Sequence, residues 1–514
     1  MLNPERRIVL KELLSVIALA LAGVLVIGWR IGHPALWFDE HVSLAFTQES
    51  WADLFGRLWP ADTHRPVYYA LLKGWMQLAG TQTGAARMLG AVLAAFSIVA
   101  VWGIGRILGG RTVGLMAAAL SVCSPMFVAQ ARELRMYPLF TLSLLLAMLA
   151  LALILRRGQT GGRWMLFAAG SASAFYAQAI GILFVPVAGA LVLGLWLGGL
   201  VPRRVIAGLA LASLAWLLLI LPGLMPMIFH TRETLADFWI PRPGPAWVWS
   251  QFAGAYPYPA FGKPVILAIL LGGFVLAFRR DRQAFWFLAA MTAATPLLLW
   301  GLSYLRPVLI VRAFVWTTLA GGIVMAFGLA ALRPALRYPL SAVVIALQLL
   351  ALRPFYPAER QQTWIDRMAP ALRDFDPGRD VMILGLTAFE PNLRWNHPWM
   401  RMADLRAFSP GDRREVFGDL LWSDHIDRAE APGMALGRGR VWIISETGSS
   451  HPASPMDDVG PALAAIRSRT VLEWRQAHGP GLLEVRIPDG QQAPCAAGTA
   501  LNPPHSPEPS CERP

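Results

Sequence analysis

Residues 137–155 read YPLFTLSLLLAMLALALIL, an uninterrupted run without a charged side chain that ends at Arg156 and Arg157. A helix needs roughly 20 mostly apolar residues to cross the hydrocarbon core of a bilayer. Similar runs recur between about residues 8 and 352, separated by short polar segments. The chain of 514 residues is 55% hydrophobic and only 15% charged, whereas a soluble domain carries about 25% charged residues. The sequence therefore predicts an α-helical polytopic membrane protein.

The apolar runs predict about eleven transmembrane helices. They are expected near residues 8–29, 86–107, 112–130, 137–155, 164–179, 181–200, 205–228, 264–278, 284–303, 310–332 and 338–352. With this count, the basic clusters between the spans fall on the same side as Arg6, Arg7 and Lys11. Basic residues favour the cytoplasmic side of a membrane, so the N-terminus is expected in the cytoplasm. The net charge of +13 follows from these topology signals, and no nucleic acid partner is expected.

The larger polar segments fall on the opposite side of the membrane. Loops 30–85 and 229–263 belong to the predicted transmembrane domain 1–352 and are expected on this outer side. Strand-like and helix-like segments then follow at 381–386, 440–445, 482–487, 361–374 and 456–468. They predict a small α/β domain over residues 353–489 in the periplasm. Residues 490–514 are rich in Pro, Ala, Ser and Gly and are expected to be disordered.

Two adjacent carboxylates follow the first span in the segment Trp37-Phe38-Asp39-Glu40-His41. Ionisable groups near a membrane that topology does not explain are candidates for function. A carboxylate here is suited to act as a general base towards a hydroxyl, or to help bind a metal. The alternative is a solvated loop whose aromatic residues lie at the membrane interface.

A second candidate motif, His64-Arg65-Pro66-Val67-Tyr68-Tyr69, opens the apolar-rich segment 67–79. Lys73 and Gly74 interrupt this short segment, so it is expected to lie in the membrane interface rather than to span the bilayer. The histidine and arginine at its start are suited to holding an anion. The alternative is a helix that begins with proline in its first turn, followed by two interfacial tyrosines.

The segment Arg132-Glu133-Leu134-Arg135-Met136-Tyr137 joins two predicted spans with almost no loop. Its arginines lie on the side where basic residues are disfavoured, and on a continuous helix their spacing of three residues would give them a common face. Guanidinium groups suit two-pronged binding of phosphate. A structural ion pair with Glu133 is the alternative.

Arg312, at the outer end of the tenth predicted span, is another arginine on the unexpected side, close to Ser303-Tyr304-Leu305-Arg306-Pro307. An anionic ligand would explain it, and so would snorkelling to a lipid headgroup. Together the motifs predict an outward-facing pocket with carboxylates at one end and arginines that hold a phosphate.

The order of these motifs resembles the GT-C superfamily of membrane glycosyltransferases, over about residues 1–335. Within it, the chain is most similar to bacterial relatives of protein O-mannosyltransferases and of the lipid A aminoarabinose transferase. The resemblance implies a multi-pass protein of the bacterial inner membrane that moves a hexose or pentose from a polyprenyl-phosphate donor to an acceptor hydroxyl. Transfer is implied on the periplasmic face with inversion, to a lipid, a glycan or a protein.

The resemblance also assigns roles to residues. Asp39 would be the general base, and Glu40 would assist it or bind a divalent metal, the one cofactor considered. With the motifs above, the residues expected to bind donor phosphate or substrate are His64, Arg65, Tyr68, Arg132, Arg135, Tyr137 and Arg312. Arg65 departs from the family, which usually has proline there, and Phe314 lies near a position where tyrosine is common.

A transporter or flippase of a lipid-linked anion is the alternative function, because it also needs outward arginines. A transporter is expected to show ionisable or Gly- and Pro-broken segments near mid-membrane, often in paired halves. The predicted spans show no such pairing, and their polar residues cluster at one face. The sequence therefore favours a glycosyltransferase.

Overall fold

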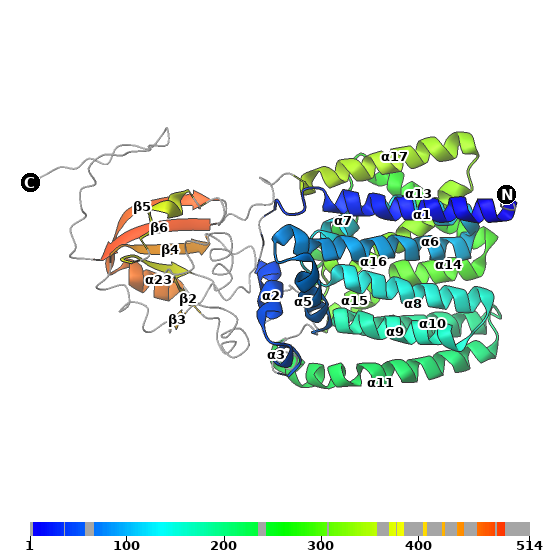
Figure 1. Ribbon diagram of the computed structural model, residues 1–514, viewed down its shortest axis with the longest axis horizontal. Coiled ribbons are helices and arrows are strands. Elements are labelled where there is room, and N and C mark those ends of the chain that lie inside the picture. The colour runs from blue at the N-terminus through cyan, green and yellow to red at the C-terminus, as the bar shows by residue number, and fades with distance from the viewer. Residues whose placement is uncertain are drawn as a thin grey trace, which may run out of the picture.

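The computed structural model describes most of the chain. The described residues are 4–34, 36, 38–56, 66–234, 243–305, 308–356, 368, 370–376, 378–384, 405–408, 424–426, 439–446, 460–478 and 481–488. Figure 1 shows a bundle of long helices and, beyond one end of it, a smaller region built on a sheet. The prediction of a helical polytopic membrane protein with a small C-terminal sheet region is confirmed.

The helices of the bundle follow the apolar runs of the sequence. In chain order they are α1 Pro4–Gly28, α2 Phe38–Gln48, α3 Trp51–Gly56, α5 Val67–Ala79, α6 Thr83–Val122, α7 Pro125–Ala131, α8 Tyr137–Arg157, α9 Gly161–Ala177, η1 Ala179–Leu183, α10 Phe184–Leu197, α11 Arg203–Thr234, α12 Pro245–Ala255, α13 Lys263–Arg280, α14 Arg282–Ala289, η2 Ala290–Ala294, α15 Thr295–Ser303, η3 Val311–Phe314, α16 Val315–Ala330, α17 Pro334–Leu352 and η4 Arg353–Phe355. Eight helical segments among the described residues are long and apolar enough to cross a membrane.

The difference between eight segments and the eleven expected spans has a structural origin. α6 joins two expected spans into one element of 40 residues, while α9 has only 17 residues and α13 has basic residues at both ends. Gly110 in α6 has φ 83°, a left-handed conformation that favours glycine. A Cβ on Gly114 would lie 2.8 Å from the carbonyl oxygen of Trp102, twelve residues earlier. The two arms of α6 therefore fold back on each other.

α16 is the central helix of the bundle. In the most apolar 18-residue stretch of Val311–Ala330, 94% of the residues are buried, and α16 packs against both α6 and α13. In the spans of α1, α11 and α17 only 22%, 28% and 28% of the residues in the most apolar 18-residue stretch are buried. Large apolar side chains such as Leu25 and Leu349 are exposed on these helices. Apolar exposed faces of this kind suit contact with lipid, so these three helices belong to the outer surface of the bundle.

The two ends of the bundle carry different elements. Short helices α2, α3 and α5 cover the end that faces the sheet, and the N-terminus lies at the other end (Figure 1). Near the N-terminus, Glu12 of α1 accepts a hydrogen bond from Arg106 of α6. Arg156 and Asp281 form a second ion pair. Both pairs join segments that the sequence predicts on one side of the membrane.

The C-terminal region contains a six-stranded sheet in the order β3-β2-β1-β4-β6-β5. Its elements are η5 Ala371–Asp374, β1 Val381–Leu384, β2 Leu405–Phe408, β3 Asp424–Ile426, β4 Val441–Glu446, α23 Gly460–Arg467, β5 Thr470–His478 and β6 Gly481–Pro488. Strands β3, β2, β1 and β4 are parallel, and β6 is antiparallel to β4 and β5. The strands expected near 381–386, 440–445 and 482–487 correspond to β1, β4 and β6, while β2, β3 and β5 were not expected.

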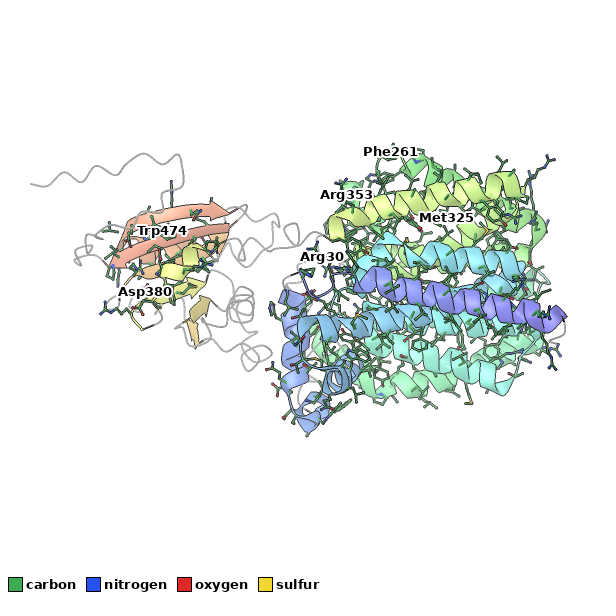
Figure 2. All side chains as sticks on the ribbon, turned by 45° about the horizontal axis from the view of Figure 1, so that its top comes forward. Arg30, Phe261, Met325, Arg353, Asp380 and Trp474 are labelled. Carbon is green, nitrogen blue, oxygen red and sulfur yellow. The ribbon has the colours of Figure 1, made fainter. Side chains whose placement is uncertain are left out.

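Buried polar contacts hold the first parallel strands. Asp380, just before β1, is 4% exposed and accepts hydrogen bonds from the indole of Trp442 at 2.9 Å and the backbone N–H of Arg440 at 3.0 Å. Figure 2 labels Asp380 and Trp474 in the sheet, and Arg30 and Arg353 at the end of the bundle nearest to it. The expected helix at 361–374 lies mostly outside the described residues, and the one expected at 456–468 corresponds to α23.

Candidate active site

Asp39 and Glu40 lie in the first turn of α2, at the end of the bundle that faces the sheet. Carboxylates are favoured there because the N-terminus of a helix carries a partial positive charge. Successive residues of a helix point about 100° apart, so the two side chains meet different surroundings. The side chain of Asp39 is 26% exposed, whereas Glu40 is fully buried.

Glu40 takes part in a buried ion pair with Arg87 of α6. Arg87 donates from Nη2 to Oε2 at 2.6 Å and from Nε to Oε1 at 2.8 Å, a two-pronged geometry. Oε1 also accepts the backbone N–H of Leu134 at 2.9 Å. Arg87 is 3% exposed and donates further to the carbonyls of Ile31 and Pro34. Glu40 therefore ties α2 to α6 and to the loop between α7 and α8.

These contacts do not fit metal binding by Glu40. Both of its carboxylate oxygens accept hydrogen bonds from the Arg87 guanidinium, a cation that already neutralises the charge a metal would need. Among the residues that the structure describes, no group of three or more His, Cys, Asp and Glu side chains is arranged to hold a metal ion. We therefore derive no step through a metal.

Asp39 lies between two arginines from distant parts of the chain. Nη1 of Arg312, in η3, is 3.1 Å from Oδ2 of Asp39, and Nη2 of Arg135 is 3.4 Å from the same oxygen. Arg135 also donates from Nη1 to the backbone carbonyl of Asp39 at 3.2 Å. The side chain of Arg312 is 32% exposed, against 6% for Arg135. The structure thus brings together a carboxylate and two guanidiniums that were separate motifs in the sequence.

Two of the expected tyrosines surround Arg135. Tyr68 of α5 and Tyr137 of α8 are both almost completely buried. Burial raises the pKa of the Tyr68 hydroxyl above its ordinary value, and Arg135 opposes this shift. Burial alone would lower the pKa of Arg135, but Asp39 and neighbouring tyrosines raise it above its ordinary value. Arg135 therefore stays positively charged in its buried position.

The α7–α8 loop can approach Asp39 because α6 has a glycine where the end of α7 packs closely against it. A Cβ added to Gly90 of α6 would overlap the carbonyl oxygen of Ala131, the last residue of α7. α8 begins only at Tyr137, so the intervening residues are free of helix geometry and turn towards α2. The hydrogen bond from Leu134 to Glu40 holds this turn in place.

Arg132 lies apart from Arg135 and does not share a helix face with it. It donates to the carbonyls of Ile27 and Trp29 at 2.5 and 2.7 Å, at the C-terminal end of α1, where helix carbonyls have no partner in their own helix. Its guanidinium also lies 4.6 Å from the ring centroid of Tyr356. Burial lowers the pKa of Arg132. These contacts give Arg132 a structural part in capping α1.

Two site residues escaped the sequence analysis. Arg87 begins an expected span on the outer side, where arginine is disfavoured, and this signal was available in the sequence. Glu133 was predicted only as a structural ion-pair partner of the neighbouring arginines, but its Oε2 is buried and makes no hydrogen bond among the described residues. His64 and Arg65, with Arg306, lie outside the described residues.

Comparisons with known proteins agree with this architecture. Residues 63–230 match the sequence family described as dolichyl-phosphate-mannose-protein mannosyltransferase. No curated protein sequence matches the chain. The chain is similar to the structure of ArnT from Cupriavidus metallidurans in the apo state, with a TM-score of 0.63, 12% identity, and coverage of 91% of this chain and 97% of that chain.

Two further structures have a similar fold. ArnT from the same organism bound to undecaprenyl phosphate gives a TM-score of 0.62 at 12% identity, with the same coverage of 91% and 97%. The apo oligosaccharyltransferase of Archaeoglobus fulgidus gives a TM-score of 0.52 at 12% identity, covering 90% of this chain and 73% of that chain. At such low identity these structures show the fold alone.

The fold and the family match define a multi-pass membrane protein with the GT-C architecture, so the resemblance predicted from the sequence is confirmed. Residues 63–230 thus match a family of glycosyltransferases, and the chain as a whole has the fold of a GT-C enzyme.

Proposed function

We propose that this enzyme transfers a sugar from a polyprenyl-phosphate donor to a hydroxyl group of an acceptor, on the extracytoplasmic face of the membrane and with inversion. The observation that carries the proposal is the contact of Asp39 with both Arg135 and Arg312. A dolichyl-phosphate donor in the name of the matched family and undecaprenyl phosphate bound to a protein of similar fold support the donor class.

The three side chains are suited to an in-line displacement. Asp39 takes the proton from the acceptor hydroxyl, whose oxygen attacks the anomeric carbon of the sugar. The bond from that carbon to the phosphate oxygen breaks, and both electrons leave with the lipid phosphate. Arg135 and Arg312 stabilise the negative charge on the phosphate. Donor binding thus draws the guanidiniums away from Asp39, and its carboxylate becomes available for the acceptor.

The topology proposed for this reaction has eleven transmembrane helices. The second arm of α6, together with α9 and α13, supplies the three spans beyond the eight that meet the length and apolarity criterion. Clusters of basic residues at the end of the bundle that carries Glu12 support a cytoplasmic N-terminus. In this orientation residues 1–352 form the catalytic domain, 353–489 the extracytoplasmic α/β domain of the inner membrane protein, and 490–514 its tail.

An Asp39→Asn variant tests the proposal. The full-length protein is purified, reconstituted in vesicles, and supplied with a radiolabelled polyprenyl-phosphate sugar and an extract of cell-envelope acceptors. A positioned general base contributes about 10²–10⁴-fold to a rate, so we expect the variant to transfer sugar about 10³-fold more slowly than the wild type. Its donor binding is expected to be preserved, because both arginines are still present.

Asp53→Asn serves as the matched control. Asp53 is a nearby carboxylate in the first turn of α3, where it pairs with the hydroxyl of Ser50, and its replacement is expected to leave the rate within about twofold. Full activity of Asp39→Asn would remove the base assignment. If the wild type moves the labelled lipid between leaflets and transfers no sugar, the protein is a flippase instead.

A further inference from the structure

Glu133 is an ionisable group at this site that takes no part in the transfer step proposed above. It lies in the α7–α8 loop, between Arg132 and Leu134, and its Oε2 is buried without a hydrogen-bond partner among the described residues. A buried carboxylate oxygen without a partner is costly. In an enzyme such a cost is commonly found where the group acts in the chemistry.

The backbone on both sides of Glu133 is held against the first turn of α2. On its C-terminal side, Leu134 donates to Glu40, and Arg135 contacts both the backbone carbonyl and the carboxylate of Asp39. On its N-terminal side, Arg132 is fixed to the end of α1. With both neighbours anchored, Glu133 is kept close to Asp39.

Charged and titratable groups from four elements face Glu133. Burial raises its pKa to about 7 from an ordinary value of 4.5. Arg312 of η3 and Arg135 of its own loop lower the pKa, while Asp39 and Glu40 of α2 raise it. The hydroxyls of Tyr68 and Tyr137, from α5 and α8, also lie within electrostatic reach of Glu133.

Asp39 and Glu133 thus have opposite surroundings. The carboxylate of Asp39 contacts two guanidiniums directly, whereas the buried Oε2 of Glu133 has no hydrogen-bond partner among the described residues. Carboxylates whose environments differ in this way commonly divide the steps of proton transfer between them. A group with a pKa near the working pH is well suited to accept a proton.

We propose that Glu133 is the proton-accepting partner of Asp39, a role that rests on the proposed sugar transfer. The acceptor hydroxyl gives its proton to Asp39 as its oxygen bonds to the anomeric carbon, and the lipid phosphate leaves with the electron pair. Asp39 then passes the proton to Glu133. Asp39 returns to its ionised form, ready to pair again with Arg135 and Arg312, and Glu133 releases the proton to solvent.

Infrared titration of the purified full-length protein tests the proton-binding part without any need for sugar transfer. The carbonyl absorption of a protonated carboxyl group is followed from pH 5 to pH 9. We expect one band that disappears with a midpoint near pH 7 in the wild type and is missing from Glu133→Gln. Glu12→Gln, which alters another buried carboxylate of the bundle, is expected to keep the band. Its presence in Glu133→Gln, or its absence from the wild type, overturns the proposal.

The pH dependence of transfer tests the catalytic part. The wild-type rate is expected to rise with pH through a midpoint near 7, as Glu133 becomes able to accept a proton. Glu133→Gln is expected to lose this rise and to be about tenfold to a hundredfold slower at pH 8, while Glu133→Asp keeps the rise. A Glu133→Gln enzyme with the wild-type rate and pH profile overturns the proposal while sugar transfer itself stands. If Gln at this position prevents folding, a flat pH profile in Glu133→Asp overturns it.

Discussion

Among the described residues of the helix bundle, two carboxylates each lie between two arginines, and the two sets are near opposite ends of the bundle (Figure 1). Glu12 of α1 accepts a hydrogen bond from Nε of Arg106 at 2.7 Å and lies 3.8 Å from Nε of Arg111. Asp39 of α2 lies 3.1 and 3.4 Å from its two arginines. By residue type and distance, the two sets are nearly the same.

The two sets differ in how far the carboxylate is exposed to solvent. The side chain of Glu12 is 3% exposed, although Arg106 and Arg111 are 36% and 42% exposed. The indole of Trp102 adds a donor to Glu12 at 3.1 Å. The carboxylate of this set is therefore closed to ligands, and it joins α1 to α6. The side chain of Asp39 is 26% exposed, and that of Arg312 is 32% exposed. An ion pair that a ligand can reach is able to exchange its partners. The same ion-pair chemistry therefore forms a structural joint at one end and a candidate reaction centre at the other.

The largest effect is expected at the buried ion pair between Arg87 and Glu40, because this pair holds α2 and therefore supports the Asp39 set. Arg87→Ala leaves the buried carboxylate of Glu40 without its cation, and breaking a buried pair costs about 3–5 kcal/mol. The thermal midpoint of the detergent-solubilised protein is expected to fall strongly. The double variant Arg87→Met/Glu40→Met removes both charges and is expected to recover much of the loss. A stable Arg87→Ala protein would show that the pair does not hold the site together.

A smaller effect is expected at the set formed by Asp39, Arg135 and Arg312. Arg312→Gln removes a guanidinium that is proposed to bind donor phosphate, and kcat/KM for the lipid donor is expected to fall about 100-fold, or about 2.7 kcal/mol. Arg312→Lys keeps the charge without the planar fork and is expected to recover only part of the activity. Arg106→Gln, at the closed set, is the control and is expected to leave donor kinetics unchanged. Equal losses in both variants would contradict the distinction between the sets.

A pH-dependent stability effect is expected from Glu133. Its pKa in the folded protein, about 7, lies above the ordinary value of 4.5, so the folded state binds more protons than the unfolded state between these values. The contribution of Glu133 to stability is therefore greatest below pH 4.5, falls as pH rises towards 7, and levels off above it. Glu133→Gln stays neutral and is expected to gain on the order of 1 kcal/mol relative to wild type at pH 8. Thermal unfolding at pH 5 and pH 8 measures this, and an equal difference at both pH values would contradict it.

The smallest effect is expected from Glu12→Gln. The amide oxygen of glutamine can still accept hydrogen bonds from Trp102 and Arg106, and Arg106 is itself 36% exposed, so the loss is expected to be about 0.5–1 kcal/mol. The thermal midpoint is expected to fall slightly while the transfer rate stays within about twofold. A large loss of activity would place the closed set in the reaction after all.

The helical bundle was predictable because its signal is composition over long windows. A run such as 137–155 has no charged side chain on any face of the helix, and it forms α8 with nearly the expected bounds. The sheet was harder to predict. β1 has only four residues, and β5 contains polar residues throughout, so its place in the sheet depends on pairing with β6 rather than on its own pattern.

At the site, the residues that topology could not explain were the ones that could be found. Asp39, Arg135 and Arg312 stood out for this reason, and the structure brings them together. The separate uses of Arg132 and Arg135 could not be predicted, because the expected common face assumed a continuous helix, which ends at Ala131. Likewise, the adjacent acidic residues Asp39 and Glu40 do not reveal from the sequence which side chain is buried.

The anchorage of Tyr356 has a consequence for how such a protein can be rebuilt. Its hydroxyl donates to the carbonyl of Val26 at 2.7 Å, and its ring lies against the guanidinium of Arg132. Among the described residues, the side chains that contact Asp39 and Glu40 all precede Tyr356 in the chain. Tyr356 is therefore a suitable junction for chimaeras: a different soluble domain fused after it is expected to leave the Asp39 centre intact.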